Sequence, residues 1–251
     1  MIVHLSEQQF QGLVKEIKET FAIICVIELQ ESDRDTASWN EQKQCYEVEY
    51  RRRLKDYFII HEVGHIFLAE ITKNHKLIPI LATREIIFEY CNSILDCFVD
   101  HRAFHHYEEY YPFFLNYIDE ILTKKMDFME SILFIISNDL HHFLSYYIQF
   151  YLTFHYVLKS EDHQARQLKI KSFLRKCERI IRQKSDLTHD DIADLKQKLD
   201  SFDQIKSTRD SNVIFHFIFK ILLELSLWDE EEIRAHMQLY FDFTVNNVKL
   251  T

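Results

Sequence analysis

The sequence predicts a mainly α protein, of the α+β class with a minimal β-element. The chain has 251 residues but only two glycines and two prolines, whereas hairpins and βαβ turns draw heavily on both residue types. Apolar residues make up 47% of the chain, and most of them recur at helical spacing. We therefore expect long helices around a buried core, with strands only near the N-terminus.

The charge and the cysteines limit the class of protein. The formal net charge is −10, and a nucleic-acid binder needs a clustered basic surface, so we expect no nucleic-acid partner. The five cysteines are an odd number without a CxxC pair, and the N-terminus lacks a charged segment followed by an apolar one. These features predict a reduced, cytoplasmic protein.

Two segments, residues 131–158 and 212–228, are apolar enough to raise the question of a membrane span. The charged and polar residues inside them would be costly in hydrocarbon. These are Asn138, Asp139, His141 and His142 in the first segment, and His216, Lys220 and Glu224 in the second. We interpret both segments as buried core helices and expect no membrane span.

The N-terminal part is expected to form one helix and two paired strands. Apolar residues at helical spacing predict a helix over residues 7–20. Residues 21–29 are short and β-branched, which indicates a buried strand, and alternating apolar and charged residues over 46–50 predict a strand that pairs with it. Residues 30–42 are polar and are predicted to be a loop.

Two helices follow, over residues 54–71 and 83–107, and the rest of the chain is expected to be helical. Asp127 is expected to cap a helix that covers the apolar segment 131–158. A change in character near residue 110 suggests a catalytic part, 1–110, and a helical part, 111–251, or one continuous domain.

Three capping signals predict the later helices. Ser160 is expected to cap a basic amphipathic helix, Thr188 with Asp191 resembles a capping box, and Asp229 opens the last helix. The buried stripe of the basic helix is expected to comprise Leu168, Phe173, Leu174, Cys177 and Ile181.

The residues with the clearest chemistry are His61, Glu62 and His65, inside the apolar run 57–69. Positions i and i+4 share one face of a helix, so both imidazoles can bind one metal ion while Glu62 stands beside them. Catalytic zinc keeps three protein ligands and one open position for water. We therefore predict a Zn²⁺ site with His61 and His65 as ligands and Glu62 as the general base.

The next predicted helix offers candidates for the third ligand. Acids and one amide recur there 4, 3, 4 and 4 residues apart, near one face, and a buried charge is costly without a partner. They are Glu85, Glu89, Asn92, Asp96 and Asp100. The row predicts a cation beside it, and the spacing alone leaves the choice of ligand open.

The segment from His61 to His65 resembles the active-site helix of the zincin metallopeptidases. The resemblance is limited to this helix and the following one. It implies that the two histidines bind zinc, that the glutamate is the catalytic base, and that a third ligand comes from downstream. The metzincin subclass is excluded, because Leu68 and Ile71 stand where it would have glycine and histidine.

The resemblance also orders the candidates for the third ligand. Residues 92–100 resemble the downstream asparagine-and-acid segment of some zincins, which favours Asp96, with Glu89 and Asp100 as alternatives. In the gluzincin layout, the ligand is a glutamate, and an acid four residues later supports a histidine. Asp96 with Asp100 has that spacing with a shorter ligand, and Glu85 with Glu89 has it with a glutamate. Asn92, Asp100, His105 and His142 are candidates to support a ligand or to stabilise an oxyanion, and His105 is also an alternative ligand.

The sequence thus predicts a zinc metallopeptidase that hydrolyses peptide bonds in a protein or peptide substrate. A different reading is a catalytically silent zincin-like protein that binds a protein partner through its helical C-terminal part. A third is a coincidental motif in a helical bundle, in a chain with 14 histidines.

Overall fold

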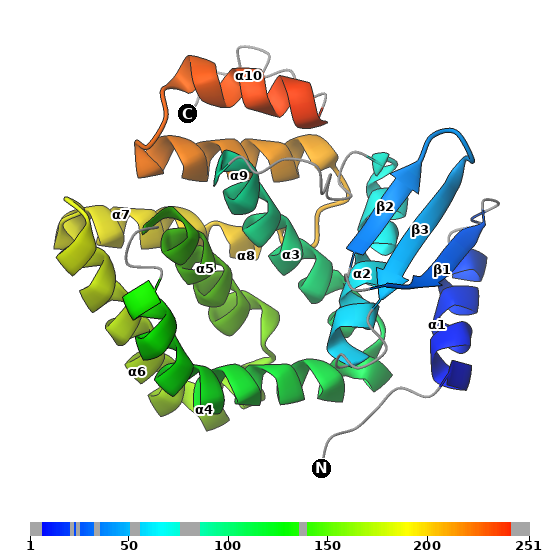
Figure 1. The fold of residues 1–251 in the computed structure, drawn as a ribbon, viewed down its shortest axis with the longest axis horizontal. Coiled ribbons are helices and arrows are strands. Elements are labelled where there is room, and N and C mark those ends of the chain that lie inside the picture. The colour runs from blue at the N-terminus through cyan, green and yellow to red at the C-terminus, as the bar shows by residue number, and fades with distance from the viewer. Residues whose placement is uncertain are drawn as a thin grey trace. The chain divides into compact units, whose positions relative to one another are not determined.

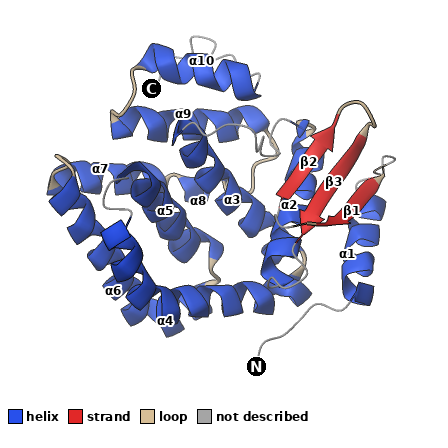
Figure 2. Ribbon diagram, viewed as in Figure 1, coloured by secondary structure: helices blue, strands red, loops and turns tan. Residues whose placement is uncertain are grey.

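The fold is mainly helical with one small sheet, as the composition predicts (Figures 1 and 2). The computed structural model describes residues 7–20, 23, 26–32, 36–50, 56–75, 86–135 and 140–241. The chain divides into two compact units, residues 1–83 with 98–119, and residues 84–97 with 120–251. The division falls inside helix α3, whose backbone is one unbroken helix from Ile86 to His106.

The first unit combines the sheet with the helix that carries the histidine motif. Its elements are α1 (Glu7–Thr20), β1 (Ile27–Glu31), β2 (Thr36–Asn40), β3 (Cys45–Tyr50), α2 (Asp56–Thr72), the end of α3 (Ile86–His106), the 3-10 helix η2 (Glu108–Tyr110) and the start of α4 (Tyr111–Ile135). The strand order is β1-β3-β2. β1 runs parallel to β3, with Ile27 opposite Tyr46, and β2 runs antiparallel to it, with Asn40 opposite Cys45.

The sheet corrects one prediction. Residues 30–42 are not all loop, because they include β2. A tight turn makes this strand possible: the side chain of Asn40 accepts hydrogen bonds from the backbone of Gln42 and Lys43, both at 3.0 Å, and Gln44 adopts a left-handed φ of 52°. An edge strand needs only one neighbour, so a polar segment without a strand pattern of its own can join the sheet.

Helix α2 packs against β2 and β3. The inward side of the sheet presents Ala37, Tyr46 and Val48, all buried, and ten consecutive residues of α2, from 60 to 69, are buried as well. The predicted pairing of the first and second strands is confirmed, and the motif helix lies within two residues of its predicted limits. The sheet therefore supports the helix that carries His61 and His65.

The second unit is a helical assembly. It contains most of α4, α5 (Leu140–Leu152), the π-helix η4 (Thr153–Val157), α6 (Ser160–Lys184), α7 (His189–Asp200), α8 (Phe202–Ile205), α9 (Ser211–Leu225) and α10 (Glu230–Phe241). Helix α5 contacts α6 and α7, and α9 lies against α7 and α10. Phe173 of α6 meets Phe150 and Phe154 edge to face, with ring centroids 5.1 and 5.7 Å apart. Helix α9 is strongly apolar because it packs against both α7 and α10.

Two helix starts in this unit differ from prediction. Helix α4 continues through Asp127, so no helix begins there. Ser160 is the first residue of α6, and Lys159 holds the cap position without a side-chain hydrogen bond. The signals at Thr188 and Asp229 are confirmed: Thr188 and Asp191 form a capping box, and Asp229 accepts a hydrogen bond from the backbone of Glu232 at 2.7 Å.

The buried stripe of α6 differs from prediction at one position. Phe173, Leu174, Cys177 and Ile181 are buried as expected, but Leu168 is 84% exposed and Ile170 is buried in its place. Position 168 lies five residues before Phe173, which turns it away from the stripe on a helix with 3.6 residues per turn.

Among the described residues, none of the helices combines the length and the apolarity that crossing a bilayer needs.

Candidate metal centre

The motif histidines lie on one face of α2, inside the first unit. His61 and His65 are one turn apart, and their ring centroids are 4.9 Å apart with nearly perpendicular planes. His61, Glu62 and His65 are all buried, with exposed fractions of 7%, 8% and 2%. Three ionisable side chains that are close in sequence are therefore shielded from water. Burial of such groups is costly unless each has a partner nearby.

A glycine between the histidines lets α3 approach α2. A Cβ atom at Gly64 would lie 2.8 Å from Cγ1 of Val99 and 3.1 Å from Cβ of Ala103. Contacts that short are sterically forbidden or strained, so any larger residue would push the two helices apart. The glycine, which helix propensity alone disfavours, thus sets the distance between the histidines and the acids of α3.

Asp100 of α3 supports His61. Nδ1 of His61 lies 2.7 Å from Oδ1 of Asp100, and the hydroxyl of Tyr57 donates a hydrogen bond of 2.8 Å to Oδ2. A carboxylate only accepts, so the proton of the imidazole is on Nδ1 and the lone pair of Nε2 is available to a metal. Both oxygens of Asp100 are engaged, which suits a supporting role better than direct ligation.

Tyr57 was not among the sequence candidates, although it lies one turn before His61 on the same face. Its ring stacks on Tyr117 of α4, with centroids 4.0 Å apart and an interplanar angle of 6°, and on Phe104 of α3 at 5.6 Å. The spacing of 57, 61 and 65 was a usable signal. The aromatic partners that hold the phenol come from distant parts of the chain, so no sequence pattern indicated them.

The ligand atoms of His61, His65 and Asp96 all lie within 4.8 Å of one another. Asp96 is on the same unbroken helix as Asp100, one turn earlier. Two donors that share a zinc ion at about 2.0–2.2 Å each are roughly 3–4 Å apart, so the group needs only small side-chain movements to bind one ion. Two imidazoles and a carboxylate form a donor set that suits zinc.

Asp96 also has neighbours on α5. Nε2 of Gln149, on α5, donates a hydrogen bond of 3.0 Å to Oδ2 of Asp96. Desolvation raises the pKa of the Tyr146 phenol on α5, and the nearby charges of Glu89 and Asp96 raise it further. Neither residue was a sequence candidate, because the approach of α5 to α3 leaves no local pattern.

The remaining candidates stand apart from this group. Glu89 and Asn92 are half-buried on α3, earlier along the helix than Asp96. His105 is half-buried and stacks on His101, with centroids 4.5 Å apart. Within the part of the chain that the structure describes, Glu89 and His105 do not belong to the cluster around His61 and His65. Glu85 and the side chain of His142 lie outside the described residues.

A second cluster of potential ligands lies on the sheet and has a simpler explanation. Glu28, Cys45 and Glu47 offer atoms within 4.8 Å of one another. Nζ of Lys43 bonds to Glu28 at 2.8 Å and to Glu47 at 2.9 Å, and these contacts raise the pKa of Lys43. The two acids therefore already share a cation, and the cluster is an exposed ion-pair network.

Comparison of the chain with protein-family models, with curated proteins and with solved structures finds no match.

Proposed function

We propose that this chain is a zinc-dependent metallopeptidase that hydrolyses peptide bonds in a protein or peptide substrate. The observation that carries the proposal is the buried group of His61, His65 and Asp96, whose ligand atoms lie within 4.8 Å of one another. The hydrogen bond from His61 to Asp100 adds support, because such carboxylates orient the metal-binding histidines of zinc enzymes.

Each residue has a distinct task in this mechanism. Nε2 of His61, one ring nitrogen of His65 and one carboxylate oxygen of Asp96 would hold the metal, while Asp100 keeps the proton of His61 on Nδ1. When bound, zinc supplies Lewis-acid chemistry that makes a water nucleophilic near neutral pH and polarises the substrate carbonyl. The carboxylate of Glu62 takes a proton from the attacking water and delivers it to the leaving nitrogen.

The experiment compares the wild type with Glu62→Gln, His65→Ala and Glu41→Gln. We expect one zinc ion per wild-type chain by elemental analysis, and chelator-sensitive cleavage of a diverse peptide library. Glu62→Gln should keep its zinc and lose about 10²- to 10⁴-fold in cleavage rate, because only the proton carrier is missing. His65→Ala should lose both zinc and cleavage. Glu41 lies exposed in the β2–β3 turn, so Glu41→Gln is the matched control and should behave like the wild type.

Wild-type protein without stoichiometric metal, or full activity of Glu62→Gln, would overturn the mechanism. Stoichiometric zinc without cleavage of any library peptide would instead support the catalytically silent alternative, a zinc-stabilised interaction protein. Asp96→Ala and Glu89→Ala locate the third ligand in the same assay. We expect zinc to be lost from the first variant and retained by the second, since Glu89 stands apart from the cluster.

A further inference from the structure

Helix α6 carries a strongly basic face in a chain whose net charge is −10. Between residues 166 and 184 it has eight lysines and arginines and a single acid, Glu178. An exposed basic helix is often only a solvated surface. Here the cations line a groove, which makes a specific binding role testable.

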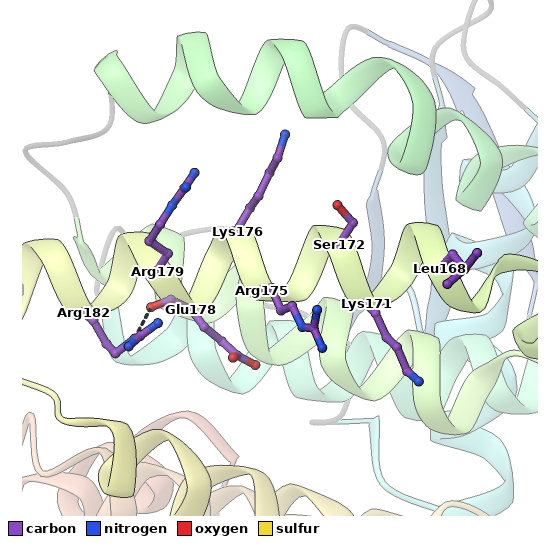
Figure 3. A pocket seen from close by; sticks show the side chains of 8 residues that line it. All are labelled: Leu168, Lys171, Ser172, Arg175, Lys176, Glu178, Arg179 and Arg182. Carbon is purple, nitrogen blue, oxygen red and sulfur yellow. Dashed lines mark hydrogen bonds between the residues drawn. The ribbon is translucent and has the colours of Figure 1, made fainter.

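The basic side chains line a groove of about 670 Å³. Figure 3 shows the described lining residues, which come from α6, with Leu168 and Arg182 at opposite ends of the row. The cationic ones are Lys171, Arg175, Lys176, Arg179 and Arg182. The groove belongs to the second unit alone.

Three of these cations, Lys171, Arg175 and Arg179, have no compensating acid among the described residues. Lys171, Arg175 and Arg179 are exposed and follow one another at i, i+4 and i+8, where like charges repel. No hydrogen bond or ion pair joins these three side chains to another described residue. Glu178, the acid in the lining, is already engaged by Nζ of Lys196 at 2.5 Å and by the hydroxyl of Tyr147 at 3.1 Å. Within the described part of the chain, these three cations therefore remain available to an external anion.

One apolar side chain accompanies the cations. Leu168 is 84% exposed and stands one turn before Lys171, on the same side of the helix. The sequence pattern placed it in the buried stripe, and the structure turns it out to the end of the basic row. A ligand that fits this surface offers several negative charges and an apolar group near one end.

We infer that this groove binds an acidic segment of a partner protein, with its carboxylates on the lysines and arginines and an apolar residue against Leu168. Neighbouring cations of the row are about 6 Å apart along the helix. In an extended chain, side chains on one face repeat about every 6.6 Å, so alternate acids meet successive cations. Arginine forks suit carboxylates because both groups are planar and bond in pairs.

Two other polyanions fit less well. Proteins that bind single-stranded nucleic acid stack the bases on aromatic side chains, and no described residue in the lining is aromatic. A helix that lies on an anionic membrane presents a broad apolar face to the lipid, but the apolar stripe of α6 is buried against the protein core. Both remain competitors in the test below.

The experiment measures binding of a fluorescein-labelled Glu-rich decapeptide with one leucine to the full chain by fluorescence anisotropy. The double variant Arg175→Glu with Arg179→Glu should weaken binding at least about tenfold, because two charge-assisted contacts become repulsive. The control, Lys169→Glu with Lys220→Glu, makes the same charge change at exposed sites outside the groove and should stay within about twofold of wild type. Leu168→Ser should weaken binding by a smaller factor. Thermal unfolding followed by circular dichroism checks that each variant is folded.

A decapeptide with glutamine in place of glutamate should bind far more weakly, and raising the salt to 1 M should weaken binding of the acidic peptide. Equal losses in the two double variants would overturn the proposal, as would no binding by the wild type. Tighter binding of oligo-dT or of phosphatidylserine vesicles than of the peptide, with the same dependence on Arg175 and Arg179, would also overturn it. If the charge-reversed double variant does not fold, Arg175→Gln with Arg179→Gln against Lys169→Gln with Lys220→Gln gives the same comparison. The measurement needs neither metal nor cleavage, so its outcome is independent of the peptidase proposal.

Discussion

At the scale of single residues, the candidate centre depends on how Asp100 is held. Its two oxygens receive hydrogen bonds from His61 and Tyr57, and the carboxylate is buried with an exposed fraction of 2%. A buried carboxylate with both oxygens engaged has little rotational freedom, so it fixes the ring plane and the tautomer of His61. The direction of the Nε2 lone pair is thereby set before any metal arrives.

This arrangement predicts a graded loss of metal affinity. Asp100→Asn keeps the shape of the side chain but removes the charge that favours the Nδ1 proton of His61, and zinc affinity should fall about 10- to 100-fold. Tyr57→Phe leaves the charge of Asp100 and removes one hydrogen bond, so its loss of affinity should be smaller. Competition against a chromogenic chelator measures both. Wild-type affinity in Asp100→Asn would show that the carboxylate does not support a ligand.

At the scale of elements, the contact between α2 and α3 depends on a missing side chain. Gly64 allows Val99 and Ala103 to approach the backbone of α2, which aligns the histidine face of one helix with the acid face of the other. The other glycine, Gly12 on α1, has no atom within 4 Å of a hypothetical Cβ. Substitution at Gly12 therefore tests helix propensity alone, whereas substitution at Gly64 tests propensity together with packing.

Alanine at these two glycines should have opposite effects on stability. Gly12→Ala should raise the free energy of unfolding by about 0.5–1 kcal/mol, because alanine loses less backbone entropy in a helix. Gly64→Ala has the same propensity gain but meets Val99, and overpacking of about 1–3 kcal/mol should leave it net destabilised. Urea unfolding followed by circular dichroism measures both. Adding Val99→Ala to Gly64→Ala should recover part of the loss, and stabilisation by Gly64→Ala alone would contradict the close approach.

Elements governed by local patterns were predictable from the sequence, and those governed by distant neighbours were not. The capping box at Thr188 and the motif helix follow from residues within one turn of each other. The strand β2 does not, because an edge strand depends on the neighbouring strand that the rest of the chain offers.

At the scale of the whole molecule, burial controls the chemistry of the cysteines. The described cysteines Cys45, Cys91, Cys97 and Cys177 are buried, and none forms a disulfide with another described residue. Burial raises the pKa of the Cys91 thiol from 9.0 to about 12, and burial with the nearby charge of Glu178 does the same for Cys177. Because the thiolate is the reactive form, these two side chains are inert in the folded protein.

The raised pKa values predict how reactivity and stability change with pH. At pH 8.5 native Cys91 and Cys177 should resist iodoacetamide and react fully in urea, which peptide mass spectrometry can follow. In the unfolded chain these thiols ionise near their ordinary pKa of 9.0, whereas in the folded chain they stay protonated up to about 12. Folded protein thus holds more protons between these values, and their contribution to stability, complete below pH 9, is lost as the pH rises toward 12. Rapid alkylation of both thiols in the native state would contradict their burial.

The sequence by itself determined the helical class and the place of His61, Glu62 and His65 on one helix, because composition and periodicity act over a few residues. It also predicted a third ligand from the acids of the following helix: the spacing left the choice open, and the resemblance favoured Asp96 over Glu89 and Asp100. Only the tertiary structure distinguished these three acids. A carboxylate oxygen of Asp96 lies within 4.8 Å of the ligand atoms of both histidines, Asp100 is hydrogen-bonded to His61 and Tyr57, and Glu89 is not part of either group. The physical reason is that a helix pattern fixes which residues share a face, whereas the register of that face against another helix depends on contacts such as those at Gly64.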